Sequence, residues 1–114
     1  MGGDIKIRKA DGTWVVRAGG AVLGETHDAL ELAEGSLPPV IYFPRADIAM
    51  AFLDKTDKVS HCPWKGDAAH YSIVTKSTTL ANSAWSYESP NPDVDRIKDH
   101  MAFYLSDKLT VERL

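Results

Sequence analysis

Short runs of β-forming residues recur along the chain, and turn-forming residues separate most of them. The runs cover residues 5–8, 13–16, 21–25, 71–75, 84–87, 101–105 and 109–112. Asp11-Gly12 and Gly19-Gly20 divide the first three runs, as expected for strands that are joined by tight hairpins. We therefore predict a mostly β fold, in the β-rich α+β class.

Two segments depart from this pattern. Residues 40–43 are continuously apolar, which predicts a strand that is buried on both faces. Ile48, Ala51 and Phe52 have the spacing of one helical stripe, so one short helix is expected over residues 47–53. We also expect a turn at residues 56–58 and a single helical turn within residues 93–98.

The size and charge of the chain limit its possible partners. Its 114 residues suit one domain over residues 1–114, and a net charge of −3 with no Lys/Arg-rich block argues against nucleic-acid binding. No apolar run is long enough to span a membrane, and no signal peptide is apparent. The single cysteine fits a reducing compartment, so a cytoplasmic location is expected.

The densest group of reactive side chains lies in residues 61–66, His-Cys-Pro-Trp-Lys-Gly. Cys62 is a candidate nucleophile, with Lys65 to stabilise negative charge and His70 or His100 as a base that the fold would have to bring near. His61 is poorly placed as that base because consecutive side chains of an extended chain point to opposite faces. The alternative is that Cys62 is a buried packing residue, as free cysteines often are.

The same region suggests a binding pocket. Lys65 would supply positive charge beside the flexible Gly66, and aromatic side chains with polar tips often line ligand sites. Asp47 or Glu34 would serve as a polar anchor. The predicted ligand-binding residues are Tyr42, Asp47, His61, Lys65, Tyr71, Trp85 and Tyr87.

Spacing gives no support for a metal site or a cofactor. The four histidines contain no His-x-x-x-His pair, and the single cysteine excludes a Cys-x-x-Cys pair. We therefore expect neither a metal nor a cofactor.

Four segments resemble motifs of one known family, in the same order along the chain. They are residues 39–48 ("PVYYFPxxDV"), 61–68 ("CPYKGxA"), 84–90 ("AWxYxxP") and 97–104 ("IxGyvAFY"). Together they resemble the family catalogued as domain of unknown function 427, over residues 5–111. Trp64 replaces the usual tyrosine, and Asp99 and His100 stand where the family often has glycine and an aromatic residue.

The resemblance implies a fold of the β-tent type, with coiled antiparallel sheets folded over one another. Similar small domains often bind zinc through two Cys-x-x-Cys pairs, which this chain lacks. A nucleotidyltransferase label is sometimes attached to the family, and we discount it because likeness of fold alone is weak support for a chemistry.

Three functions remain open at this point. The first is a domain that binds a small polar or anionic molecule. The alternatives are a cysteine- or lysine-assisted enzyme that acts on a small metabolite, and a structural or partner-binding module. Binding is favoured over catalysis because no residue pair has the spacing of an activated nucleophile. Exposed strand edges would also suit a homodimer.

Overall fold

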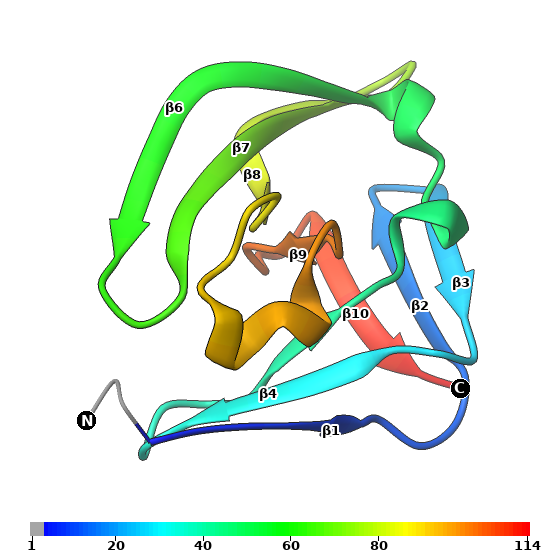
Figure 1. The fold of residues 1–114 in the computed structure, drawn as a ribbon. Coiled ribbons are helices and arrows are strands. Elements are labelled where there is room, and N and C mark those ends of the chain that lie inside the picture. The colour runs from blue at the N-terminus through cyan, green and yellow to red at the C-terminus, as the bar shows by residue number, and fades with distance from the viewer. Residues whose placement is uncertain (1–3) are drawn as a thin grey trace.

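Three antiparallel sheets make up the computed structural model, which describes residues 4–114 (Figure 1). The first sheet contains β1 (Ile5–Lys9), β4 (Leu30–Glu34) and β5 (Val40–Tyr42), in the order β1-β4-β5. The second contains β2 (Trp14–Ala18), β3 (Ala21–Thr26) and β10 (Leu109–Arg113), in the order β10-β2-β3. The third, referred to below as the arched sheet, contains β6 (Leu53–Cys62), β7 (Gly66–Val74), β8 (Thr79–Ser86) and β9 (Ala102–Phe103), in that order. The predicted mostly β, antiparallel fold is confirmed.

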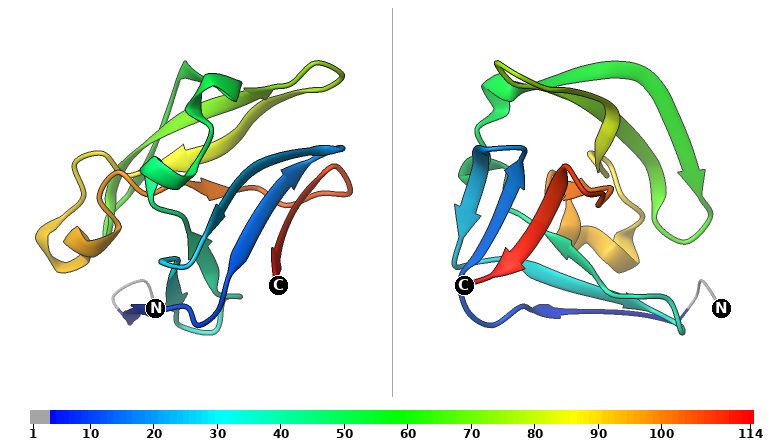
Figure 2. Two further views of the ribbon diagram at one scale, coloured as in Figure 1. Left: turned by 90° about the vertical axis from the view of Figure 1, so that its right-hand side faces the viewer. Right: turned by 180° about the vertical axis from the view of Figure 1, so that it is seen from behind.

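The arched sheet curves over the rest of the molecule. In Figure 1 the long strands β6 and β7 bend so that their hairpin end comes down beside the end of β4. Figure 2 shows the second sheet on the side of the molecule away from this hairpin. The hairpin and the first sheet therefore meet at a place remote from the second sheet.

Two hydrophobic cores lie against the arched sheet. One is shared with the second sheet, and its buried members include Val16, Leu23, Phe43, Ile73, Ala84 and Phe103. The other is shared with the first sheet, and its members include Leu30, Leu32, Tyr42, Ala68, Ile97 and Ala102. Ala84 pairs with Phe103 across β8 and β9, and the next pair, Trp85 with Ala102, belongs to the other core. Since successive side chains of a strand point to opposite faces, the arched sheet separates the two cores.

The helical segment expected at residues 47–53 is present only as two 3-10 turns, η1 (Arg45–Asp47) and η2 (Met50–Phe52). Ile48, between them, has extended backbone and pairs with Gly24 of β3 as an isolated bridge. A helix of seven residues has little stability of its own, so this pairing with the second sheet prevails over the apolar stripe. The helical turn expected within residues 93–98 is the 3-10 segment η3 (Pro92–Ile97).

The turn predicted at residues 56–58 is wrong. These residues lie inside β6, where the pairing with β7 shifts register between Lys55 and Val59. A bulge of this kind increases the bend and twist of a strand. The polar residues that suggested a turn therefore mark the point where the arched sheet bends.

A substitution at Gly24 tests how closely η1 packs against β3. A Cβ atom at Gly24 would lie 2.5 Å from the Asp47 carbonyl oxygen and 2.6 Å from Ile48 Cδ1. We expect Gly24→Ala to lower the free energy of unfolding by about 1–3 kcal/mol, as overpacking usually does. Gly20→Ala is the matched control, because a Cβ there has no neighbour within 4 Å. Urea unfolding midpoints measure both variants, and equal midpoints would contradict the close packing.

Candidate functional site

A cavity of about 160 Å³ lies between the first sheet and the arched sheet. Its strand-borne lining includes Leu32 and Glu34 from β4, Val40 and Tyr42 from β5, Ser60 from β6 and Trp85 from β8. Alternate residues of a strand share one face, so the two β4 residues lie on one wall of the cavity, and so do the two β5 residues. Segments that connect the strands supply the rest of the lining, which is Leu37, Pro38, Lys65, Tyr87 and Tyr104.

Four residues from the sequence-based set lie around this one cavity: Tyr42, Lys65, Trp85 and Tyr87. The chain separates them by as many as forty-five positions. The fold joins them because Tyr42 on β5 contacts Trp85 on β8, and the β6–β7 turn brings Lys65 to the same cavity. Among the lining residues with a side-chain hydroxyl, Ser60 and Tyr104 were not identified from the sequence.

Lys65 and Glu34 form an ion pair inside the cavity. Lys65 Nζ lies 2.5 Å from Glu34 Oε1, and the two side chains are only 12% and 15% exposed. The ammonium group also lies 5.9 Å from the centre of the Tyr87 ring, within reach of a cation–π interaction. No other charged side chain lines the cavity among the described residues, so its net charge is zero.

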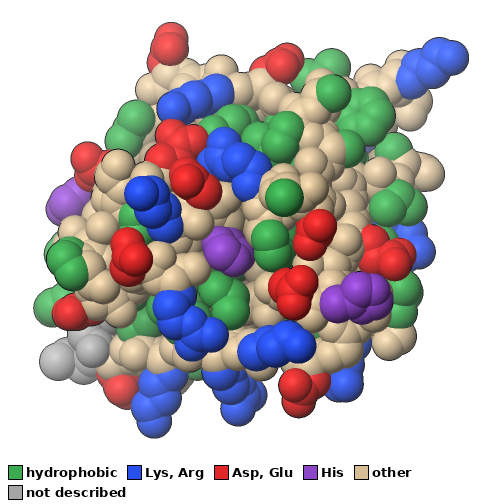
Figure 3. Space-filling model, turned by 45° about the vertical axis from the view of Figure 1, so that its right-hand side comes forward, with side chains coloured by type: hydrophobic (Ala, Val, Ile, Leu, Met, Phe, Trp, Pro, Cys, Tyr) green, Lys and Arg blue, Asp and Glu red, His purple; other side chains and the backbone are tan. Residues whose placement is uncertain are grey.

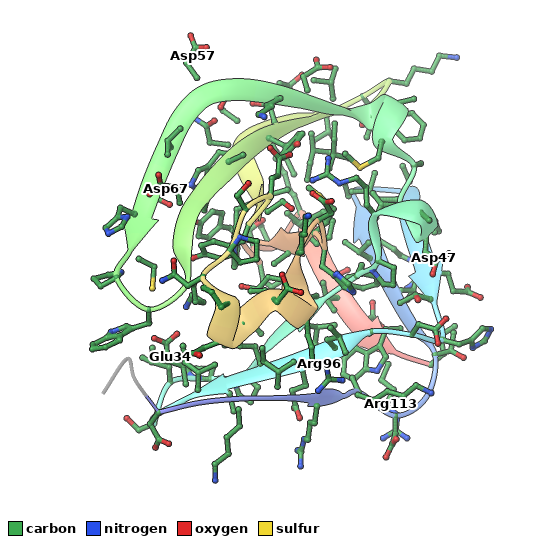
Figure 4. The ribbon with its side chains drawn as sticks, in the orientation of Figure 1. Glu34, Asp47, Asp57, Asp67, Arg96 and Arg113 are labelled. Atoms are coloured by element: carbon green, nitrogen blue, oxygen red, sulfur yellow. The ribbon has the colours of Figure 1, made fainter. Side chains whose placement is uncertain are left out.

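The turn between β6 and β7 carries Lys65 to this position. The Lys65 backbone N–H donates to the Cys62 carbonyl. The Asn91 backbone N–H donates to the Lys65 carbonyl at 2.9 Å and so holds the turn in place. Gly66 follows with φ of +110°, a conformation that other residues rarely adopt. Figure 4 shows Glu34 directly below this turn. The Lys-Gly pair of the sequence is therefore the end of the hairpin that meets the first sheet.

Aromatic rings form the opposite wall. Trp85 meets Tyr42 edge to face, with ring centres 6.3 Å apart, and lies 4.4 Å from the Tyr104 ring centre. The Trp85 indole nitrogen donates to the Tyr42 hydroxyl oxygen at 3.3 Å. Burial raises the pKa of Tyr42 well above its ordinary value, so this hydroxyl keeps its proton. Its own proton is then available for a ligand.

His70 contacts the cavity through Ser60. His70 is fully buried, its Nε2 lies 2.9 Å from Ser60 Oγ, and its ring stacks on Tyr104 at an interplanar angle of 7°. Burial, and then the nearby charge of Lys58, lower the pKa of His70, which favours the neutral ring. Its Nδ1 has no hydrogen-bond partner in the described part of the chain. A neutral imidazole that is hydrogen-bonded to a hydroxyl can accept a proton, but no carboxylate of residues 4–114 hydrogen-bonds to this ring.

Cys62 is separated from the histidines. It is partly buried and packs against the core that includes Tyr42 and Tyr87. His61, the next residue in the chain, is exposed and lies 2.7 Å from Asp67 Oδ1 through its Nδ1. Within residues 4–114, no histidine ring hydrogen-bonds to Cys62. Of the other two residues predicted to act with Cys62, Lys65 bonds to Glu34 and His70 bonds to Ser60.

Asp47 and His61 do not line the cavity. Asp47 accepts a hydrogen bond from the Thr26 hydroxyl at 2.8 Å and so ties η1 to β3. Figure 4 shows Asp47 at the far end of the molecule from Glu34. Of the two polar anchors considered from the sequence, Glu34 is the one that lies in the cavity.

Tyr71 belongs to a second polar cluster on the other face of the arched sheet. Arg45 Nη1 donates to the Tyr71 hydroxyl at 3.1 Å, and Nη2 donates to Ser86 Oγ and Glu88 Oε2, each at 3.0 Å. Glu88 also accepts from the Tyr71 hydroxyl and, at 2.8 Å, from Lys55 Nζ. The Tyr71 ring packs in the core shared with the second sheet. This cluster fastens η1 to the arched sheet, and its groups bond mainly to one another.

The surface carries mixed charge on the face that Figure 3 shows, where acidic and basic side chains lie interspersed. Over residues 4–114, no three His, Cys, Asp or Glu side chains are grouped so that they could hold a metal ion. None of the described helical segments is long and apolar enough to cross a membrane.

Comparison with protein families identifies the chain. Residues 6–113 match the family described as "Domain of unknown function (DUF427)". Because the match covers nearly all of the sequence, the protein belongs to this family, as the four motifs indicated. No curated protein matches the chain.

The Arg45–Glu88 cluster predicts a pH dependence of stability. Burial alone would raise the pKa of Glu88, but hydrogen bonds from Lys55, Tyr71 and Arg45 outweigh it and lower the pKa from 4.5 to about 2. The folded state therefore favours the ionised carboxylate, and this stabilisation is present above about pH 4.5 and is lost as the pH falls toward 2. Between pH 6 and pH 2, the wild type should lose more stability than Glu88→Gln. Parallel urea titrations at several pH values measure this, and parallel losses would contradict it.

Proposed function

We propose that the protein binds a small polar organic molecule in the cavity between the first sheet and the arched sheet. The observation that supports this most is the convergence of Lys65 with three aromatic residues, Tyr42, Trp85 and Tyr87, around one cavity. Ligand sites typically combine aromatic walls with a few polar groups that fix orientation.

The volume limits the size of the ligand. A space of about 160 Å³ is close to cavities that hold a benzene-sized molecule, and well below the usual drug-sized pocket. The part of a ligand inside this cavity therefore has on the order of six to ten non-hydrogen atoms.

The ion pair limits the chemistry of the ligand. Glu34 already neutralises Lys65, so a simple anion has to displace a buried carboxylate to reach the ammonium group. Leaving a buried charge without its partner is costly. A neutral ligand with hydrogen-bond donors and acceptors, or one with balanced charges, avoids this cost. The Tyr42 hydroxyl and Ser60 offer further polar contacts.

Filling the cavity tests the proposal. We expect Ser60→Phe to occupy the space and to weaken fragment binding by tenfold or more, on the order of the loss expected when a pocket is blocked. Val59→Phe is the matched control, since Val59 is the neighbouring residue on β6, is 64% exposed and does not line the cavity. Saturation-transfer NMR with polar fragments of the stated size gives the affinities.

A second control separates the two effects of changing Ser60. Ser60→Ala removes the hydrogen bond to His70 and leaves the cavity open. It should bind fragments nearly as well as the wild type. Equal affinity of the wild type and Ser60→Phe, or no binding by the wild type at all, would contradict the proposal.

A further inference from the structure

The cavity that holds the Lys65–Glu34 ion pair, called the polar cavity below because of that pair, adjoins a larger, mainly apolar one. This second cavity has a volume of about 430 Å³ and shares Pro38, Val40, Trp85 and Tyr104 with the first. The rest of its wall is mainly apolar and includes Trp14, Ile41, Phe103, Leu105 and Val111. Among the described residues, Glu31 is the charged member of this lining, and it forms an ion pair with Arg8 at 2.6 Å. Trp85 and Tyr104 thus border a small polar space and a larger apolar one.

The polar space offers two opposite charges side by side. A lysine ammonium group has three N–H donors. One donor of Lys65 bonds to Glu34, and the other two remain for a ligand. The Glu34 carboxylate likewise retains acceptor sites. A ligand with a carboxylate and an ammonium group matches both partners at once, and the neutrality of the cavity is preserved. A ligand with one charge matches one partner and is repelled by the other.

We propose that the ligand is a small zwitterion of the α-amino-acid type with a large apolar side chain. This inference rests on the proposed function and specifies its ligand class. The carboxylate of the ligand bonds to Lys65, with the Tyr42 hydroxyl as a further donor. The ammonium group bonds to Glu34, and the apolar side chain passes Trp85 and Tyr104 into the larger cavity.

Calorimetric titration with L-phenylalanine and matched analogues tests the charge requirement. N-acetyl-L-phenylalanine keeps only the negative charge, L-phenylalanine amide keeps only the positive charge, and N-acetyl-L-phenylalanine amide has neither. We expect L-phenylalanine to bind about tenfold or more tightly than each analogue, the scale of one lost charged hydrogen bond. L-alanine, which lacks the ring, should also bind at least about tenfold more weakly.

Two substitutions in the polar cavity should invert the preference among these ligands. Glu34→Gln leaves Lys65 unpaired, so N-acetyl-L-phenylalanine should become the tightest ligand. Lys65→Met leaves Glu34 unpaired, so L-phenylalanine amide should become the tightest. Thermal unfolding midpoints establish that both variants are folded, and an unchanged order of affinities in a folded variant would overturn the inference.

A substitution in the apolar cavity tests the side-chain site separately. Leu105 is 62% exposed, so Leu105→Asp should leave the fold intact. This variant places a charge in the apolar cavity, so the affinity for L-phenylalanine should fall toward the affinity for L-alanine. If an analogue with one charge or none binds the wild type as well as L-phenylalanine, the zwitterion inference fails and the proposed function stands. If none of these ligands and no polar fragment binds, both fail.

Discussion

The buried ion pair between Lys65 and Glu34 joins the two parts of the molecule that form the cavity. It links the β6–β7 hairpin of the arched sheet to the end of β4 in the first sheet, across thirty-one positions of the sequence. Burying two charges carries a desolvation cost that a well-packed apolar pair avoids, and such pairs are weak evidence for stability. The pair places two opposite charges in the cavity, and the proposed ligand site uses both.

The arched sheet makes this arrangement possible because one of its faces packs in a core and the other lines the cavity. One face packs with the second sheet around Phe43, Ile73 and Phe103, and nearby the Arg45–Glu88 cluster holds η1 in place. On the other face, Trp85 and Ser60 line the cavity. The buried His70 hydrogen-bonds to Ser60 and so contacts the cavity indirectly. The rigid core on one side of the sheet therefore supports an open, polar space on the other.

Local pattern predicted most of the strands, since alternation and turn residues depend only on near neighbours. It was wrong at residues 47–53 and 56–58, where pairing of Ile48 with Gly24 and a bulge in β6 decide the backbone. Both features arise from contacts between distant segments, which periodicity does not reveal.

The candidate site was predicted in part for the same reason. Lys65 and the aromatic residues stood out by type, but their type does not show which face each one occupies. Tyr71 has the same chemistry as Tyr42 and lies on the other face of the arched sheet. Ser60 was missed because the turn expected at residues 56–58 obscured the strand on which Ser60 and Cys62 share a face.

The three tryptophan indole N–H signals in an ¹⁵N-resolved NMR spectrum test the central claim most directly. Trp85 donates its indole proton to Tyr42 inside the cavity, Trp14 donates to the Asp11 carbonyl beside the larger cavity, and Trp64 is 48% exposed outside both. On addition of a polar fragment or L-phenylalanine, the Trp85 signal should shift most and that of Trp64 should stay in place. A shift confined to Trp64, or saturating binding with no shift of Trp85, would contradict a ligand site between the two sheets.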